Sequence, residues 1–261
     1  MNKTALVTGA SGGLGLEFCK LLANDGYDVV LVARSTKKLT QLKKYLEETY
    51  SVNAYVITKD LSEENAAQQV FDETNRLGLN INVLINNAGF GDYGYFVKSD
   101  WQKQKSMINL NIMSLAHLTY LYANEMVKCG FGRIMNLASV ASFMPGPMMA
   151  NYYATKAYVL SLTEALSVEL KNTGVSICAL CPGPTKTGFE EAAGAESADI
   201  FNDAYTMDAK TVASYGYAKM LTGRTVIIPG LQNKLLTKTG RFIPRSLMHN
   251  AVYFIQKQRR G

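Results

Sequence analysis

The sequence lacks any long apolar run and any segment that would divide it. No window approaches the roughly eighteen consecutive apolar residues that a helix needs to cross a bilayer, so an integral membrane protein is not expected. The apolar run at the N-terminus is too short for the core of a signal peptide, so an export signal is not expected either. No linker rich in Pro, Gly or Ser interrupts the 261 residues, and we expect one domain.

The sequence is also poor in cysteine. Among its four cysteines, Cys178 and Cys181 form a Cys-x-x-Cys pair, which is compatible with a redox pair or with half of a zinc site. No second pair accompanies it, and Cys178 lies inside an apolar run, where a small buried side chain is typical. Free thiols in a reducing compartment are therefore expected, and this favours a cytoplasmic location.

Acidic residues are absent from the last fifth of the chain. All 21 Asp and Glu residues precede position 209, whereas ten of the 27 Lys and Arg residues follow Asp208. The net charge of +6 therefore comes from the C-terminal segment, and the part before it is mildly acidic. This distribution excludes a uniformly basic nucleic-acid-binding protein, and no nucleic-acid partner is expected.

The sequence does contain a regular alternation of apolar strands with stretches of helical apolar spacing. Strands that are buried on both faces and alternate with helices are typical of a parallel sheet. The predicted fold class is α/β, a single doubly wound, Rossmann-type domain with a seven-stranded parallel sheet. The predicted strands are Thr4 to Thr8, Val29 to Ala33, Ala54 to Thr58, Val83 to Asn86, Arg133 to Ala138, Val175 to Leu180 and Thr225 to Ile228.

A glycine-rich turn connects the first predicted strand to the first helix. It differs from the Gly-x-Gly-x-x-Gly of dehydrogenase Rossmann folds, because position 18 is Phe. Glycines also serve ordinary turns, but between a strand and a helix they let the backbone approach a pyrophosphate at the positive helix end. The turn therefore predicts a nucleotide site with contacts from Gly9, Ser11, Gly13, Leu14 and Gly15.

The end of the second predicted strand indicates which nucleotide binds. An Asp or Glu here would bind the ribose hydroxyls of NAD, but the strand ends in Ala33-Arg34-Ser35. A base attracts a ribose phosphate, so Arg34 favours NADP(H) over NAD(H). The alternative interpretation is a solvated arginine at the end of a strand.

Further motifs follow along the chain. Asn86-Asn87-Ala88-Gly89 ends the fourth predicted strand, Tyr152-x-x-x-Lys156 lies in a later helix, and Asn111, Ser139 and Pro182-Gly183 occupy other positions. Together with the glycine turn, these motifs resemble the signature of the classical short-chain dehydrogenase/reductase family over nearly the whole chain. The resemblance implies an oxidoreductase that interconverts a carbonyl and an alcohol with a nicotinamide cofactor.

The Tyr-x-x-x-Lys pattern alone proves nothing, because it also occurs at Tyr55, Tyr215 and Tyr253. In the family that the chain resembles, a serine lies about thirteen residues before the tyrosine. Of the four tyrosines, Tyr152 is the one with such a serine, Ser139. Tyr152 and Ser139 are therefore the predicted catalytic pair.

The chemistry of carbonyl reduction explains these residue types. A tyrosine with its ordinary pKa near 10 is a poor acid–base group at neutral pH. Lys156 lies one helical turn from Tyr152, where its charge would favour tyrosinate and lower that pKa. Ser139, at the end of the fifth predicted strand, would hydrogen-bond the substrate oxygen.

The resemblance implies the remaining roles. Asn111 would hold a water that relays protons to Lys156, and Lys156 and Tyr152 would also contact the nicotinamide end of the cofactor. Asp60 would contact the adenine, although it could equally cap a helix before Ser62. The other implied cofactor contacts are Asn87, Ala88, Gly89, Pro182, Gly183 and Thr187.

Two other functions fit parts of the sequence. A sugar-nucleotide epimerase or dehydratase of the same superfamily shares the glycine turn, but it would need a larger C-terminal domain than the residues after Ile228 provide. A non-catalytic NADPH-binding sensor or scaffold is the second alternative, because a fold does not guarantee an activity. The complete catalytic set argues against it.

The substrate is expected to be a hydrophobic ketone or aldehyde. The apolar side chains that flank the catalytic residues predict an apolar pocket, and residues 188–207 occupy the place of the family's substrate loop. The resemblance also implies a homodimer or homotetramer, formed through the helices that contain Asn111 and Tyr152. The apolar side chains in question are Phe143, Met144, Met148, Met149 and Tyr153.

The chain is expected to divide into a catalytic part, residues 1–230, and a basic extension of the same domain, residues 231–261. An apolar stripe from Pro244 to Ile255 predicts a helix in this extension. The helix would dock on the protein itself, or make weak peripheral contact with a membrane, as basic amphipathic helices do.

Overall fold

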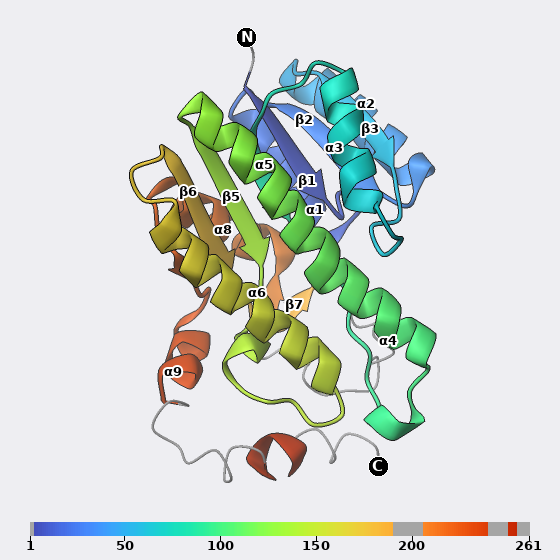
Figure 1. Ribbon diagram of the computed structural model, residues 1–261, viewed down its shortest axis with the longest axis vertical. Coiled ribbons are helices and arrows are strands. Elements are labelled where there is room, and N and C mark those ends of the chain that lie inside the picture. Colours follow the sequence, from blue (N-terminus) through green and yellow to red (C-terminus); the bar gives the residue numbers. More distant parts are fainter. Residues whose placement is uncertain (1–2, 190–205, 240–249, 255–261) are drawn as a thin grey trace.

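Seven parallel strands form the central sheet of the computed structural model, which describes residues 3–189, 206–239 and 250–254. The strand order is β3-β2-β1-β4-β5-β6-β9, so the predicted seven-stranded parallel sheet is confirmed (Figure 1). The strands are β1 (Thr4–Thr8), β2 (Asp28–Ala33), β3 (Ala54–Thr58), β4 (Ile81–Asn86), β5 (Gly132–Leu137), β6 (Val175–Leu180) and β9 (Val226–Ile227).

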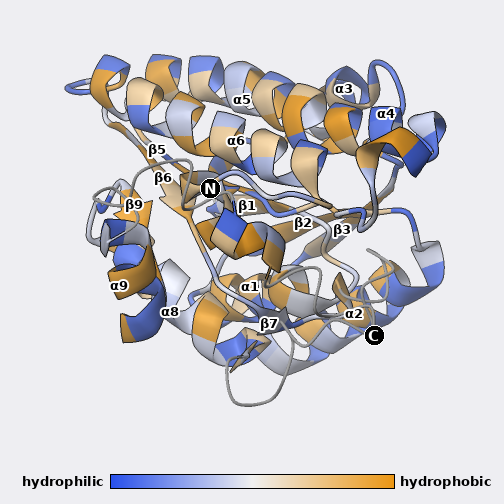
Figure 2. Ribbon diagram, turned by 90° about the horizontal axis from the view of Figure 1, so that it is seen from below, coloured by the Kyte–Doolittle hydropathy of each residue, from blue (hydrophilic) through white to orange (hydrophobic). Residues whose placement is uncertain are grey.

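Helices cover both faces of this sheet (Figure 2), which is why its strands are apolar on both sides. One face carries α1 (Gly13–Asn24), α2 (Thr36–Tyr50) and α8 (Ala209–Leu221); the other carries α3 (Ala66–Arg76), α5 (Leu115–Cys129) and α6 (Ala150–Glu169). All five residues of β1 are buried. The core is therefore two apolar layers, one on each side of the strands.

The strand order places a topological switch point between β1 and β4. From β1 the chain continues outward through β2 and β3, and from β4 it continues in the other direction through β5 and β6. In open α/β sheets, ligands bind outside the carboxyl ends of the strands at such a point. The loops after β1, β4, β5 and β6 are therefore the elements that position a site.

Shorter elements complete the description. The helix α4 (Trp101–Ile108) continues through a π-helix, η2 (Asn109–Ser114), into α5. The 3-10 helices η1 (Phe96–Lys98) and η3 (Val140–Phe143) precede α4 and α6, and α9 (Leu231–Thr239) follows β9. None of the helices in the described part of the chain combines the length and the apolar character needed to cross a bilayer.

Two features near the C-terminus were not predicted. A two-stranded sheet of β7 (Thr185–Lys186) and β8 (Met207–Asp208) brackets most of the expected substrate loop, whose residues 190–205 lie outside the described residues. The basic extension begins with α9, a helix that the sequence pattern did not predict. Of the predicted apolar stripe from Pro244 to Ile255, the described residues 250–254 are helical, and the others lie outside the described residues.

Candidate active site

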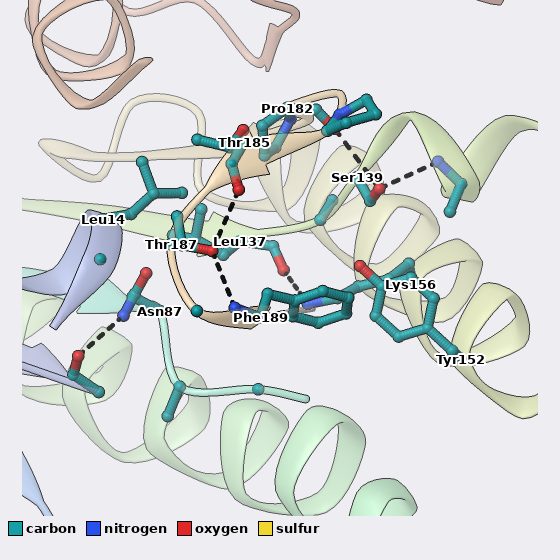
Figure 3. Close-up of a pocket in the computed structure, with 18 of the residues that line it drawn as sticks. Leu14, Asn87, Leu137, Ser139, Tyr152, Lys156, Pro182, Thr185, Thr187 and Phe189 are labelled. Atoms are coloured by element: carbon teal, nitrogen blue, oxygen red, sulfur yellow. Dashed lines mark hydrogen bonds between the residues drawn. The ribbon is translucent and has the colours of Figure 1, made fainter. Parts of the chain in front are cut away.

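A cavity of about 510 Å³ lies at the carboxyl ends of the central strands (Figure 3). Most of the predicted site residues line it; Gly15, Asp60 and Asn111 are not among the lining residues. The predicted residues in the lining are Gly9, Ser11, Gly13, Leu14, Arg34, Asn87, Ala88, Gly89, Ser139, Tyr152, Lys156, Pro182, Gly183 and Thr187. Gly188 and Phe189, from the predicted substrate loop, also line the cavity. The lining residues that were not predicted individually are Gly12, Lys38, Tyr93, Leu137, Ala138, Val140, Ala141, Pro184 and Thr185.

The turn after β1 needs glycine at two positions for different reasons. Gly9 has φ of 66°, and a Cβ there would lie 2.7 Å from the Asn87 side-chain nitrogen. At Gly15 a Cβ would collide with the carbonyl oxygen of Gly9, so the first turn of α1 can lie directly against the loop. Gly15 thus shapes the cavity floor from behind rather than lining it.

The start of α1 is open to a ligand. Its N-cap residue, Gly12, has no side chain to accept a hydrogen bond from the first backbone N–H groups of the helix. These groups and the helix dipole together suit an anion such as a pyrophosphate. Thr187 lies beside this turn, because a Cβ on Gly13 would be 2.9 Å from the Thr187 Cβ.

The ends of β1 and β4 are joined through Asn87. Its side-chain amide donates to the carbonyl oxygen of Thr8 at 2.9 Å. In return, the Thr8 hydroxyl accepts hydrogen bonds from the backbone N–H groups of Asn87 and Ala88, both at 3.0 Å. These bonds hold the loop from Asn87 to Gly89 close to the glycine turn, on the cavity wall.

Arg34 and Lys38 place two cations at one end of the cavity. The Arg34 side chain is 79% exposed, and its Nη1 lies 3.9 Å from the Asp60 carboxylate. Lys38 lies in the first turn of α2, which begins after its N-cap residue Ser35. Asp60 accepts hydrogen bonds from the backbone N–H and the hydroxyl of Ser62 within a turn. The alternative role as a helix cap is wrong, because α3 begins only at Ala66 after its N-cap residue Asn65, and an adenine contact stays a prediction.

Ser139, Tyr152 and Lys156 meet at the other end of the cavity. Ser139 follows β5, and its hydroxyl oxygen accepts from the Ala141 N–H at 3.1 Å and donates to the Pro182 carbonyl at 3.4 Å. Tyr152 and Lys156 project from one face of α6 toward it (Figure 3). The Lys156 ammonium donates to the Leu137 carbonyl at 2.7 Å and lies 5.9 Å from the centre of the Tyr152 ring.

Burial dominates the ionisation of this pair. It raises the pKa of Tyr152 above its ordinary value, and the hydrogen bond with Ser139 opposes this rise only in part. Burial also lowers the pKa of Lys156 to about 8. The expected net lowering of the Tyr152 pKa by Lys156 was therefore wrong for this arrangement: the phenol is held in its protonated form.

Asn111 lies behind the cavity, fully buried in the π-helix η2. Its side-chain amide donates to the Phe90 carbonyl at 2.9 Å and to the Thr155 hydroxyl at 3.1 Å, and its oxygen accepts from the Phe90 N–H at 3.2 Å. A Cβ on Gly89 would lie 3.0 Å from the Asn111 oxygen and 3.4 Å from the Lys156 nitrogen. Asn111 thus fixes the wall beside Lys156, while its water-relay role stays a prediction.

Comparison with known proteins shows which proteins this chain is similar to. A family model described as short chain dehydrogenase matches residues 3–198. The 7beta-hydroxysteroid dehydrogenase of Collinsella aerofaciens is 32% identical over 182 residues, 70% of this chain and 68% of that protein. The very-long-chain 3-oxoacyl-CoA reductase of Homo sapiens is 32% identical over 186 residues, 70% of this chain and 59% of that protein.

A solved structure agrees over more of the chain. The short-chain dehydrogenase from Sphingobium yanoikuyae in complex with NADPH has a TM-score of 0.83 and 31% identity, covering 94% of this chain and 95% of that one. The chain belongs to the short-chain dehydrogenase family. As a short-chain dehydrogenase it acts on CH–OH and C=O groups with a nicotinamide cofactor. The resemblance stated from the motifs is confirmed, and the epimerase or dehydratase alternative is set aside.

Apolar side chains surround the reacting end of this short-chain dehydrogenase. The ring of Phe189 lies 5.2 Å from that of Tyr152, and the ring of Tyr153 lies 6.0 Å from it. Met149 and Tyr93 also line the cavity. Of the five apolar residues expected in the pocket, Met149 and Tyr153 line it. Phe143, Met144 and Met148 do not, and Phe143 packs against the core instead.

The two cysteines of the Cys-x-x-Cys motif are buried free thiols. Burial raises the pKa of both Cys178 and Cys181 to about 12, so neither is ionised at neutral pH. The described residues contain no cluster of three metal-ligating His, Cys, Asp or Glu side chains. Both cysteines therefore belong to the buried core, Cys178 within β6 and Cys181 directly after it.

Proposed function

We propose that this short-chain dehydrogenase is an NADP(H)-dependent reductase of a hydrophobic ketone or aldehyde, with the proton supplied by Tyr152. The observation that carries the proposal is the meeting of Ser139, Tyr152 and Lys156 with an apolar wall in one cavity that continues to two cations at its far end. The end with the three catalytic side chains suits the carbonyl substrate, and the end with the two cations suits the phosphates of the cofactor.

The residues present fit a dinucleotide. The uncapped start of α1 and the glycine turn suit its pyrophosphate. Arg34 and Lys38 suit a phosphate on the adenosine ribose, which supports NADP(H) over NAD(H). Asn87 to Gly89, Pro182, Gly183 and Thr187 lie along the wall between these cations and Tyr152, where the nicotinamide half would extend.

Residues of the chain itself supply the proton and stabilise the charge that forms. A bound NADPH would supply the hydride for the carbonyl carbon. Tyr152, protonated in the free enzyme, donates its phenolic proton to the carbonyl oxygen as that oxygen gains charge. The Ser139 hydroxyl donates a hydrogen bond to the same oxygen. The Lys156 ammonium then stabilises the tyrosinate that remains, and proton uptake from solvent restores the phenol.

The lining favours an uncharged, apolar substrate. Near Tyr152 the cavity is lined by Tyr93, Met149, Tyr153 and Phe189, and Lys156 is the charged side chain at this end among the described lining residues. Its ammonium already donates to a backbone carbonyl. The names of two relatives, a hydroxysteroid dehydrogenase and a very-long-chain 3-oxoacyl-CoA reductase, support a lipid-like substrate class.

A substrate screen tests the proposed function. The purified protein is mixed with NADPH and with steroid-like, fatty and small ketones and aldehydes, and NADPH oxidation is followed by absorbance. We expect turnover to be highest with the hydrophobic carbonyls. NADPH binding without turnover across the whole panel would favour the alternative, a non-catalytic NADPH-binding protein.

We also propose that the enzyme forms a homodimer or homotetramer through α5 and α6. Large apolar side chains are exposed along this region: Tyr120 and Val127 on α5, Tyr158 and Val168 on α6, and Met113 just before α5. Their burial against a second copy would remove apolar surface from water. Light scattering after size-exclusion chromatography tests this, because a monomeric mass at micromolar concentration would contradict it.

A separate proposal concerns the basic extension. Leu231, Leu235 and Leu236 of α9 are 83%, 65% and 49% exposed, and Phe254 is 66% exposed. Exposed apolar side chains in a segment that carries bases and no acids support peripheral contact with an anionic membrane. Pelleting with anionic vesicles tests it: binding that is absent, or unchanged after truncation at Gly230, would contradict the contact.

We propose a cytoplasmic location, which the four free thiols support.

A further inference from the structure

Gln104 is an almost fully buried polar side chain that the proposed reaction does not use. It lies on α4 and is 5% exposed. Its amide is satisfied at both ends: the nitrogen donates to the Asp92 carboxylate at 2.6 Å, and the oxygen accepts from the Asn151 side-chain amide at 2.9 Å. A buried amide with two short bonds to different segments fixes how these segments lie.

The Asp92 end of this chain of hydrogen bonds belongs to the cavity wall. Asp92 lies in the segment after β4, between the Asn87–Gly89 loop and Tyr93, whose side chain lines the cavity. Its other oxygen is 2.6 Å from the Lys103 ammonium, and its side chain is 13% exposed. Both residues that hold Asp92 therefore come from α4.

The Asn151 end belongs to the first turn of α6, directly before Tyr152. The same two segments are also joined by backbone, since the Gly94 N–H donates to the Met148 carbonyl at 2.8 Å. Met148 has φ of 65°, a left-handed conformation that a methionine rarely adopts. Strain of this kind persists only where the surroundings enforce it.

The wall held in this way borders the reacting end of the cavity. A Cβ on Gly91 would lie 2.8 Å from the ring of Phe189 and 3.1 Å from the Met149 side chain. Phe189 in turn packs on Tyr152. A shift of the segment that contains Gly91 and Tyr93 would therefore change the space between this wall and the Tyr152 hydroxyl.

We propose that Gln104 is a positioning residue: through Asp92 and Asn151 it holds the Gly91–Gly94 wall against the start of α6 and so sets the width of the carbonyl half of the cavity. The inference rests on the proposed reductase activity. The cofactor half, from the glycine turn to Arg34, makes no contact with this chain of hydrogen bonds. Loss of Gln104 should therefore affect the carbonyl substrate and spare cofactor binding.

The test compares Gln104→Glu with Gln102→Glu in the full-length protein. Both variants add one negative charge to α4, but Gln102 is exposed. In Gln104→Glu the new carboxylate faces Asp92 and cannot donate to it. At pH 8 we expect the KM for a hydrophobic ketone to rise at least about tenfold, because misplacement of about 1 Å can cost about 10²-fold. The Kd for NADPH should stay within about twofold of wild type, as should both constants in Gln102→Glu.

Two rescues separate positioning from a general loss of structure. The charged groups that face the new carboxyl group are Asp92 on the wall and Lys103 on α4, and α6 presents the neutral Asn151. Burial and the nearby Asp92 carboxylate raise the pKa of such a group, so lowering the pH to about 5.5 should restore an O–H donor to Asp92 and bring the KM back toward wild type. Adding Asp92→Asn to Gln104→Glu places an amide donor at position 92 opposite the carboxylate acceptor at position 104. This double variant should also bring the KM back toward wild type.

Equal KM values in Gln104→Glu and Gln102→Glu at pH 8 would overturn the inference, and so would failure of both rescues. It would also be overturned if Gln104→Glu weakened NADPH binding by as large a factor as it raised the KM for the ketone. Wild-type turnover is measured first, and its absence with every carbonyl contradicts the proposed function alone. In that case acrylamide quenching of Trp101, the only tryptophan of the chain, still tests the position of α4. We expect stronger quenching in Gln104→Glu than in Gln102→Glu at pH 8, and equal quenching would overturn the role of Gln104.

Discussion

Removing the cation at the end of β2 should change which dinucleotide the enzyme prefers. Arg34 is 79% exposed, so its charge acts through a largely aqueous medium. Two unit charges about 4 Å apart attract by about 1 kcal/mol in water and about 4 kcal/mol at an effective dielectric constant of 20. For an exposed side chain we take an attraction near the lower end of this range, about 1.4 kcal/mol, which corresponds to about a tenfold change in the Kd for NADPH.

The neighbouring carboxylate adds to this effect. Asp60 lies 3.9 Å from the Arg34 guanidinium, and without Arg34 its charge is left to repel a ribose phosphate. We therefore expect Arg34→Ala to lower the preference for NADPH over NADH at least about tenfold. Adding Lys38→Ala should lower it further, since Lys38 is the second cation in this part of the cavity lining.

Fluorescence titration of each variant with NADPH and NADH measures the two Kd values. Lys37→Ala is the matched control, because Lys37 lies beside Lys38 on α2 and does not line the cavity. The difference between Arg34→Ala and wild type should shrink at higher salt, since exposed charges are screened within about 10 Å at 0.1 M ionic strength. An unchanged preference in the Arg34→Ala/Lys38→Ala double variant would refute this assignment of the phosphate site.

Two further predictions follow from the buried groups. The kcat/KM for carbonyl reduction should fall as the pH rises through about 8, because Lys156 loses its proton at its lowered pKa and no longer stabilises tyrosinate. A pH–rate profile that stays flat from pH 6.5 to about 9.5 would contradict this prediction. Gly15→Ala should destabilise the fold by about 1–3 kcal/mol, since the new methyl group would collide with the Gly9 carbonyl. Thermal unfolding measures it against Gly12→Ala, where a Cβ would meet nothing within 4 Å, and equal melting temperatures would contradict it.

The sheet could be predicted from the sequence because its strands are apolar runs of Val, Leu and Ile that helices cover on both faces. The first, third and sixth predicted strands have the observed bounds, and β4 begins only two residues earlier than predicted. β7, β8 and α9 could not be predicted in this way. β7 and β8 are two-residue strands that depend on a long-range pairing, and α9 leaves Leu231, Leu235 and Leu236 exposed rather than buried.

The site residues that motifs mark were predicted, and those that packing places were missed. Ser139 and Tyr152 could be found by their spacing in the chain, whereas Phe189 reaches Tyr152 only through the fold of the loop after β7. Lys38 had a usable signal, because it is a second base only four residues after Arg34, in the first turn of α2. The pKa of Tyr152 could not be predicted, since it depends on how deeply the phenol is buried.

The central claim is that Tyr152 supplies the proton for carbonyl reduction in this cavity. The most direct measurement compares the turnover and the NADPH affinity of wild type and Tyr152→Phe with the best hydrophobic ketone of the screen. Removing the hydroxyl removes the proton donor and leaves the ring, so kcat should fall by about 10²–10⁴-fold while the Kd for NADPH stays near that of wild type. Reduction of the ketone by Tyr152→Phe at the wild-type rate would contradict the account.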